Sequence, residues 1–134
     1  LKRDTIKLGL LKAKRNFNYI DTTIDGYIAA IKSRKGIGEI INIGSELEIS
    51  VENLVKIIGK NLKKKLVIKT EKKRVRPEKS EIFRLIADGK KAKKLLNWKT
   101  KMNKRYFEES IKKTIEWYMT SKNQNQINDK IYNI

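Results

Sequence analysis

Cysteine and histidine are absent from this sequence of 134 residues, and proline occurs once, as Pro77. Without the first two, these residues cannot by themselves form a disulfide, a cysteine-based zinc site, a thiolate nucleophile or a Ser-His-Asp triad. Apolar runs stay well short of the ~20 residues that a membrane span needs, and the chain does not open with a signal-peptide pattern. These absences predict a cytoplasmic protein with no metal site and no membrane partner.

Acidic residues are few: 15 Asp and Glu stand against 33 Lys and Arg, which gives a formal net charge of +18. Such a charge favours a nucleic-acid partner, because Lys and Arg neutralise phosphates. Genome composition explains it as well, since 26 of the 33 basic residues are lysine, whose codons are rich in A and T. Basic residues cluster at 60–65, 69–76 and 90–94, and these clusters contain no aromatic residue on which a base could stack. Their absence favours the simpler interpretation of solvated faces.

Hydrophobic residues make up 39 % of the sequence and recur with the periods of strands and helices. Strands are predicted at 6–8, 17–20, 39–43 and 66–68, with helices between them that begin after Asp21 and Ser50. The alternation predicts an α/β fold over residues 1–122, followed by a polar tail, 123–134, that is expected to be disordered.

The helix after Asp21 is expected to end near Ser33, and its apolar positions, with the i, i+3, i+4, i+7 spacing, are Ile24, Tyr27, Ile28 and Ile31. Asp88 and Asn103 are typical N-caps for two further helices, of which the second carries Phe107 on its apolar side. Tyr118 and Lys122 match the Tyr-x-x-x-Lys pattern of short-chain dehydrogenases. We do not interpret them as catalytic, because no dinucleotide-binding turn precedes them.

Two segments carry candidate binding residues. Around Pro77, the stretch 74–81 combines arginines with glutamates, a pattern that suits a nucleotide diphosphate: the guanidinium binds phosphate and a carboxylate accepts from the ribose hydroxyls. A solvated charged loop is the simpler interpretation of the same residues. In the second segment, Arg15 precedes the predicted strand 17–20, at a place where α/β proteins tend to bind ligands.

Three segments, taken in order, resemble the extended short-chain dehydrogenases, which are the NAD-dependent nucleotide-sugar epimerases and dehydratases. Residues 15–27 are similar to their Arg-Asp-Phe/Tyr segment, and residues 38–45 to their Asn-x-Gly-Ser strand. Residues 76–98 resemble the segment that grips the nucleotide diphosphate. The resemblance covers about residues 6–119. The residues around Tyr19 and the Arg-Pro-x-x-Ser-Glu motif at 76–81 most resemble those of the UDP-N-acetylglucosamine 4,6-dehydratases of legionaminic acid biosynthesis.

The resemblance implies that the chain is the carboxyl-terminal, substrate-binding portion of such an enzyme and lacks the amino-terminal Rossmann half. Arg15 and Arg76 would contact the diphosphate of a nucleotide-sugar, expected to be a UDP-sugar. Glu81 would lie near the ribose, with Glu78 as a rival for that role. NAD and the catalytic residues would belong to the missing half, so the chain alone is expected to be inactive.

The implied reaction removes a hydride from C4 of the sugar to NAD, eliminates water across C5 and C6, and returns the hydride to C6. This is lyase chemistry, performed by a full-length enzyme that the resemblance implies is a homodimer. A 4-epimerase of the same family is the first alternative. A small basic nucleic-acid-binding module is the second.

Overall fold

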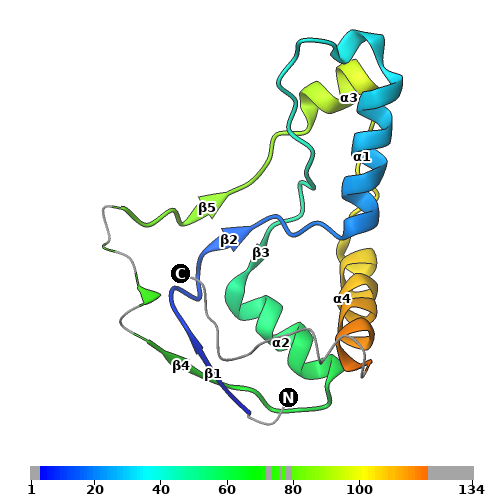
Figure 1. The fold of residues 1–134 in the computed structure, drawn as a ribbon. Coiled ribbons are helices and arrows are strands. Elements are labelled where there is room, and N and C mark those ends of the chain that lie inside the picture. The colour runs from blue at the N-terminus through cyan, green and yellow to red at the C-terminus, as the bar shows by residue number, and fades with distance from the viewer. Residues whose placement is uncertain (1–3, 72–73, 76, 78–79, 121–134) are drawn as a thin grey trace.

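The computed structural model describes residues 4–71, 74–75, 77 and 80–120. The predicted tail 123–134 lies outside them. The molecule is elongated (Figure 1), with two helices at one end and two at the other. At one end lie α1 (Ile20–Lys32), the 3-10 turn η1 (Arg34–Gly36) and α3 (Lys90–Leu96); at the other lie α2 (Val51–Asn61) and α4 (Lys104–Met119).

The strands form two small sheets. Strand β1 (Thr5–Leu8) pairs in parallel with β4 (Val67–Thr70), so that Leu8 lies opposite Thr70. In the second sheet β2 (Lys14–Arg15) lies between β3 (Ile49–Ser50), which is antiparallel to it, and β5 (Arg84–Leu85), which is parallel. Parallel strands joined through helices confirm the predicted α/β class.

One hydrophobic core lies between α2 and α4. Ile49, Met102 and Phe107 are its buried residues. Phe17 and Tyr19 pack against it, and the rings of Phe17 and Phe107 lie 6.2 Å apart between centroids. This core therefore joins α4 to the segment that leads from β2 to α1.

A second core lies at the other end, between α1 and α3, and its buried residues are Ala92, Leu96 and Trp98. Here the backbone of α1 lies very close to the side chain of Ile43: a Cβ placed on Gly26 would lie 2.4 Å from Cγ2 of Ile43. Only a glycine allows this approach without a shift of the isoleucine. The face of α1 that turns inward is thus made of small residues.

The predicted helix ends are largely confirmed. The hydroxyl of Ser50 accepts a hydrogen bond from the amide of Asn53 at 3.2 Å, and the side chain of Asn103 accepts one from the amide of Tyr106 at 2.9 Å. At α3 the N-cap is Gly89 instead of Asp88, although Asp88 Oδ1 still accepts from the first-turn amide of Lys90 at 2.9 Å.

The predicted strand at 17–20 is wrong, and so is the cap at Asp21. Strand pairing in this region involves Lys14 and Arg15 instead. Helix α1 already begins at Ile20, because the carbonyl of Tyr19 accepts a hydrogen bond from the amide of Thr22. Instead of backbone strand pairing, the side chain of Asn18 connects this segment to residue 45: its Oδ1 accepts a hydrogen bond from the amide of Ser45 at 3.0 Å. The alternation of Phe17 and Tyr19 reflects packing on the core, without strand pairing.

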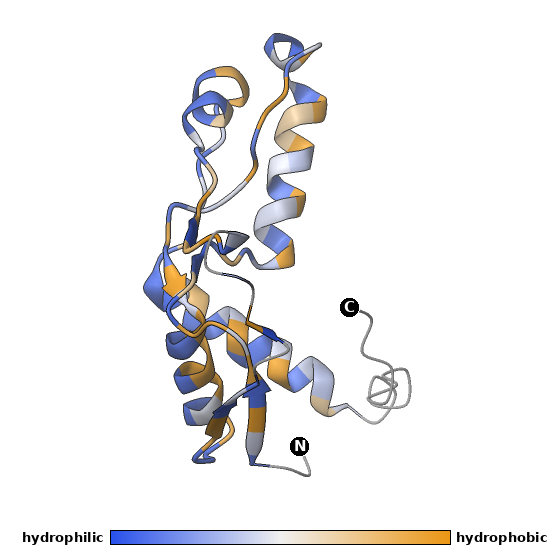
Figure 2. Cartoon of the chain, turned by 90° about the vertical axis from the view of Figure 1, so that its left-hand side faces the viewer, coloured by the Kyte–Doolittle hydropathy of each residue, from blue (hydrophilic) through white to orange (hydrophobic). Residues whose placement is uncertain are grey.

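The predicted strand at 39–43 is also wrong, because within the described part of the chain this segment pairs with no strand. Ile40 is 89 % exposed. The apolar positions predicted on α1 lie on its outward face: Ile24, Tyr27 and Ile28 are exposed, and Ile31 is 86 % exposed. Figure 2 shows hydrophobic residues recurring turn by turn along this helix.

Within the described residues, no helix has both the length and the apolar character that a membrane crossing requires.

Candidate functional site

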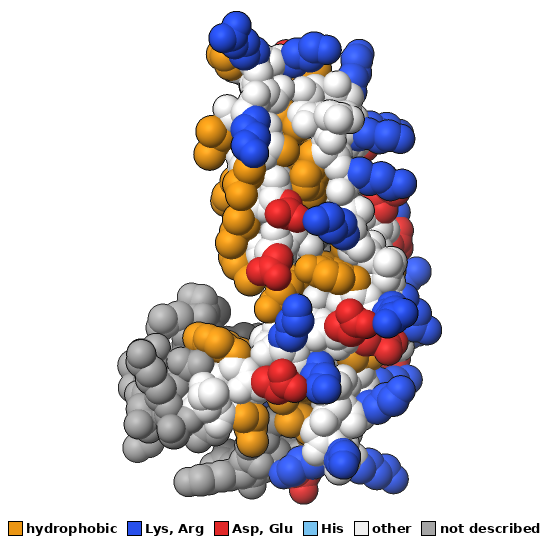
Figure 3. Space-filling view, turned by 90° about the vertical axis from the view of Figure 1, so that its right-hand side faces the viewer, with side chains coloured by type: hydrophobic (Ala, Val, Ile, Leu, Met, Phe, Trp, Pro, Cys, Tyr) orange, Lys and Arg blue, Asp and Glu red, His pale blue; other side chains and the backbone are white. Residues whose placement is uncertain are grey.

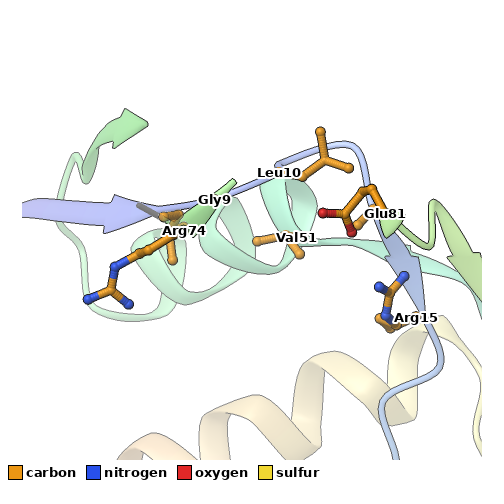
Figure 4. Close-up of a pocket in the computed structure, with 8 residues that line it drawn as sticks. Gly9, Leu10, Arg15, Val51, Arg74 and Glu81 are labelled. Atoms are coloured by element: carbon orange, nitrogen blue, oxygen red, sulfur yellow. The ribbon is translucent and has the colours of Figure 1, made fainter. Parts of the chain in front are cut away.

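A pocket of about 290 Å³ opens where β1 ends and the chain turns toward β2. Figure 4 shows it between β2, the first turn of α2 and the segment that follows β4. Eight residues line it: Leu8, Gly9, Leu10, Ala13, Arg15, Val51, Arg74 and Glu81. Polar side chains thus converge on a hollow with an apolar floor, at the carboxyl end of a parallel strand pair, where α/β proteins commonly bind ligands.

Arg15 and Glu81, which are far apart in the sequence, both line this pocket. Both are half-buried and lie at the same end of it (Figure 4). The Arg15 guanidinium donates from Nη1 to the carbonyl of Lys14 at 2.8 Å. Among the described residues it has no carboxylate partner, and Glu81 has no cation. The other two predicted binding residues, Arg76 and Glu78, lie outside the described residues.

Arg74 also lines the pocket, and we did not predict it as a binding residue. Its Nε donates to Oε2 of Glu71 at 2.6 Å, while Lys7 Nζ lies 3.6 Å from the other carboxylate oxygen. The guanidinium points away from Arg15 and Glu81 (Figure 4). The stretch 74–81 was singled out from the sequence, but the pattern gave no reason to prefer Arg74 to Arg76.

Gly9 allows the backbone at Arg74 to lie against the pocket. A Cβ on Gly9 would lie 2.1 Å from the carbonyl oxygen of Arg74, a distance that no side chain tolerates. The turn itself is closed by the amide of Arg74, which donates to the carbonyl of Glu71 at 2.9 Å. The sequence marked Gly9 only as the end of a strand, since a close contact between distant segments leaves no local signal.

The N-terminus of α2 borders the pocket at Val51 but offers it no free amide among its first three. The amides of Val51 and Glu52 donate to the carbonyls of Ala13 and Leu11, both at 3.1 Å, and that of Asn53 donates to the Ser50 hydroxyl. A helix N-terminus binds anions through such amides. The first three amides of α2 are therefore not available to bind an anion.

A second hollow, of about 410 Å³, is lined by Glu46, Arg84, Ile86, Ala87, Asp88 and Lys90. Its cations are already paired. Arg84 Nε donates to Oε1 of Glu48 at 2.9 Å, and Lys90 Nζ lies 3.8 Å from Oδ2 of Asp88. The pocket with the unpaired Arg15 is therefore the better candidate for an anionic ligand.

Two carboxylates near these hollows are stabilised by arginine. The hydrogen bond from Arg84 lowers the pKa of Glu48 below its usual value near 4.5, and that from Arg74 lowers the pKa of Glu71 in the same way. The pairing in turn raises the pKa of Arg84. The Arg84–Glu48 pair also ties β5 to the residue that precedes β3.

These low pKa values predict a loss of stability in acid. Because each folded pKa lies below the unfolded one, the stabilisation is fully present above about pH 4.5 and is lost as the pH falls through the folded pKa. We expect the melting temperature, followed by circular dichroism, to fall as the pH is lowered from about 4.5 to about 3. The fall should be smaller in the double variant Glu48→Gln/Glu71→Gln.

Glu108→Gln is the control, since Glu108 lies on α4 and has no cation partner in the part of the chain that the structure describes. Its melting profile should follow that of the wild type. Identical acid profiles of the double variant and the wild type would contradict the assignment.

Comparison with known proteins decides the family. The model of the family described as GDP-mannose 4,6 dehydratase matches residues 1–114. The chain belongs to the GDP-mannose 4,6 dehydratase family. This confirms the resemblance to nucleotide-sugar epimerases and dehydratases.

Two curated proteins are similar to the chain. An uncharacterized protein of Methanocaldococcus jannaschii is 31 % identical over 109 residues, which cover 81 % of this chain and 31 % of that protein. The UDP-glucuronate 4-epimerase of Thermodesulfobacterium geofontis is 34 % identical over 105 residues, which cover 77 % of this chain and 29 % of that enzyme. The chain thus spans about a third of the length of the curated relatives that it matches.

A solved structure shows a similar proportion. The UDP-glucuronic acid 4-epimerase of Bacillus cereus, in complex with UDP-glucuronic acid and NAD, is 29 % identical and has a TM-score of 0.68. The similarity covers 84 % of this chain and 35 % of that one.

The described residues do not fit NAD. Binding a dinucleotide requires a glycine-rich turn between a strand and a helix N-terminus. Gly36 and Gly38, the one closely spaced glycine pair, instead follow α1 and lead into the irregular segment 39–43.

Proposed function

We propose that this chain binds the diphosphate of a nucleotide-sugar, as the carboxyl-terminal, substrate-binding portion of an NAD-dependent epimerase or dehydratase. The supporting observation is that Arg15 and Glu81 line one pocket although they are far apart in the sequence. Both are the residues for which the family resemblance implies contact with the substrate. Arg76 remains a prediction for the same site.

Arg15 has the chemistry for the phosphate. Its guanidinium uses one nitrogen to bind the Lys14 carbonyl, which fixes the plane of the group. The remaining N–H groups stay available for phosphate oxygens, and such charge-assisted bonds are short and strong. The charge of +18 on the whole chain further attracts an anionic ligand to this surface.

Glu81 has the chemistry for the ribose. A carboxylate only accepts hydrogen bonds, and the two hydroxyls of a ribose can donate two of them. A second anion beside phosphate would be unfavourable if no cation stood between them. The shared pocket with Arg15 supplies that cation.

The size of the pocket limits what this chain holds. Small-molecule sites usually enclose about 300–1,000 Å³, and this pocket has about 290 Å³. It suits a diphosphate with its ribose more than a whole nucleotide-sugar. The sugar and NAD would then bind mainly to the part of the enzyme outside this chain.

For the complete enzyme we propose NAD-dependent 4,6-dehydration of a UDP-sugar, a lyase reaction, in the cytoplasm. UDP-N-acetylglucosamine is the substrate that the sequence resemblance favours. The 4-epimerase relatives support the alternative, in which the same pocket would serve an isomerase. The contribution of this chain is the same in both: it holds the substrate in place, which removes an entropic barrier. The homodimer stays a prediction.

The test compares ribose and deoxyribose ligands. Titration of the chain with UDP and with 2′,3′-dideoxy-UDP, followed by calorimetry, should show that UDP binds more tightly. Glu81→Gln should reduce or remove this difference, because the neutral amide accepts more weakly and has only one oxygen. Each lost hydrogen bond of about 1 kcal/mol corresponds to roughly fivefold in affinity.

The matched control is Glu46→Gln, which removes the same charge at the second hollow. It should leave the preference for UDP unchanged. If the chain ignores UDP and instead binds RNA with a steep salt dependence, it is a nucleic-acid-binding module and the proposal fails.

A further inference from the structure

The charged residues of the Arg15 pocket lie at two ends of it. Arg15 and Glu81 are at one end, and the guanidinium of Arg74 is at the other, pointing away from both (Figure 4). The remaining side chains of the lining are aliphatic: Leu8, Leu10, Ala13 and Val51. A ligand that spans the pocket therefore meets charged groups at both ends and aliphatic groups on the way.

The order of the groups in a nucleotide matches this arrangement. The inference rests on the proposed function, which places the diphosphate at Arg15 and the ribose at Glu81. The base is attached to the ribose on the side away from the phosphates, so it extends along the aliphatic lining toward Arg74. Its two flat faces suit aliphatic side chains, while its polar edge needs a hydrogen-bond partner once it is shielded from water.

Arg74 is held in place before any ligand binds. Its Nε donates to Oε2 of Glu71 at 2.6 Å, and its amide donates to the Glu71 carbonyl at 2.9 Å. Its own carbonyl lies against Gly9. Lys7 Nζ, at 3.6 Å, shares the carboxylate of Glu71, whose side chain is 30 % exposed. A donor that is fixed in this way loses little conformational entropy when it binds a ligand.

The guanidinium of Arg74 can distinguish one pyrimidine base from the other. It only donates hydrogen bonds: the bond to Glu71 uses the N–H of Nε, and four more N–H groups are on the two terminal nitrogens. At position 4, uracil carries an oxygen that accepts, whereas cytosine carries an amino group that donates. A donor at this place therefore favours uracil, because cytosine would set one donor against another.

We propose that Arg74 is the residue that selects the base of the nucleotide, by donating from its guanidinium to the position-4 oxygen of uracil. Glu71 is the positioning residue that holds this guanidinium in place. Cytosine nucleotides are disfavoured at the same point. Neither residue contacts the diphosphate or the ribose.

The positive charge of the chain cannot produce this preference. Lysine and arginine side chains extend over much of the surface (Figure 3), and their charge attracts any anionic nucleotide. UDP and CDP carry the same diphosphate and the same ribose. A difference in affinity between the two must therefore come from a contact with the base.

The test is calorimetric titration of the full chain with UDP and with CDP at fixed ionic strength. We expect UDP to bind about tenfold more tightly than CDP, as one charged hydrogen bond allows. Arg74→Met keeps an unbranched apolar side chain beside Gly9 and removes every donor, so it should bring the two affinities within about twofold. Glu71→Gln should reduce the preference in part, because the guanidinium is then held less firmly.

Two controls separate this role from a general disturbance of the pocket. Arg84→Met removes a guanidinium that also donates from Nε to a carboxylate, at 2.9 Å from Glu48 Oε1, but at the second hollow. It should leave the preference for UDP over CDP unchanged. The preference for UDP over 2′,3′-dideoxy-UDP, which reports on Glu81, should persist in both Arg74→Met and Glu71→Gln.

Several results would overturn the proposal. Equal affinity of the wild-type chain for UDP and CDP would refute base selection while leaving the diphosphate site intact. A preference that persists in Arg74→Met would exclude Arg74 as its source. Loss of the dideoxy-UDP difference in Arg74→Met would show that the variant distorts the whole pocket. If the wild-type chain binds no UDP, the proposed function fails, and the role of Arg74 fails with it.

Discussion

Replacing Arg15 with alanine is expected to weaken UDP binding about 10- to 100-fold. A hydrogen bond to a charged group contributes about 1.5–3 kcal/mol, and each 1.4 kcal/mol is a factor of ten. Arg15 is half-buried in the pocket, and no carboxylate among the described residues competes for it. Calorimetry at fixed ionic strength measures the change. Arg15→Lys should recover only part of the affinity, because an ammonium cannot grip a phosphate with two parallel bonds.

Arg105→Ala is the matched control, since it also removes one guanidinium. Arg105 lies on α4, its side chain is 89 % exposed, and it pairs with Glu109 at 2.9 Å. UDP affinity should remain near the wild-type value in this variant. Equal losses in both variants would mean that UDP follows net charge alone, and the role of Arg15 as a specific contact would be refuted.

Replacing Phe107 with alanine is expected to destabilise the chain by about 3–5 kcal/mol, the usual cost of removing a buried aromatic ring. Phe107 is 2 % exposed and packs with Ile49, Met102 and Phe17. Folded domains have a free energy of unfolding of about 5–15 kcal/mol. Because each core of this chain contains few buried residues, the loss should be most of its stability. Urea unfolding followed by tryptophan fluorescence measures it.

The comparison variant is Ile31→Ala, which removes a large apolar side chain that is 86 % exposed. Its free energy of unfolding should change by less than about 0.5 kcal/mol, as expected for a surface position. If Ile31→Ala proved as destabilising as Phe107→Ala, the described burial of these two positions would be contradicted.

Helix positions were predictable because their signals are local. Ser50 and Asn103 cap α2 and α4 through bonds to amides three residues away, so the residue type and the spacing together define the ends. Phe107 was likewise found from the period of α4. Such features need no information about distant parts of the chain.

The errors concern residues whose state depends on distant segments. The segment 39–43 has the composition of a buried strand, but a strand forms only where another one pairs with it. The helical spacing of Ile24 and Ile28, by contrast, correctly predicted a helix with an apolar side. Phe17 and Tyr19 alternate because both pack on one core.

The site was predictable in part. The sequence pattern alone predicts Arg15 and Glu81 as binding residues, and the structure brings both to one pocket. Their roles in binding stay predictions. Arg74 and Gly9 were missed as parts of the site, because the contact between Gly9 and the Arg74 carbonyl joins segments that no local pattern connects.

The occupied amides at the start of α2 have a consequence for how ligand preference can change. The first three amides of α2 are bound to Ala13, Leu11 and Ser50, so this helix end contributes little to choosing a ligand. Recognition then falls to a few side chains, each of which can be exchanged by a single codon change while the scaffold stays intact. The family of this chain is described by a GDP-sugar, whereas one of its relatives is a UDP-glucuronate 4-epimerase. An arrangement of this kind would allow such a change of nucleotide to evolve.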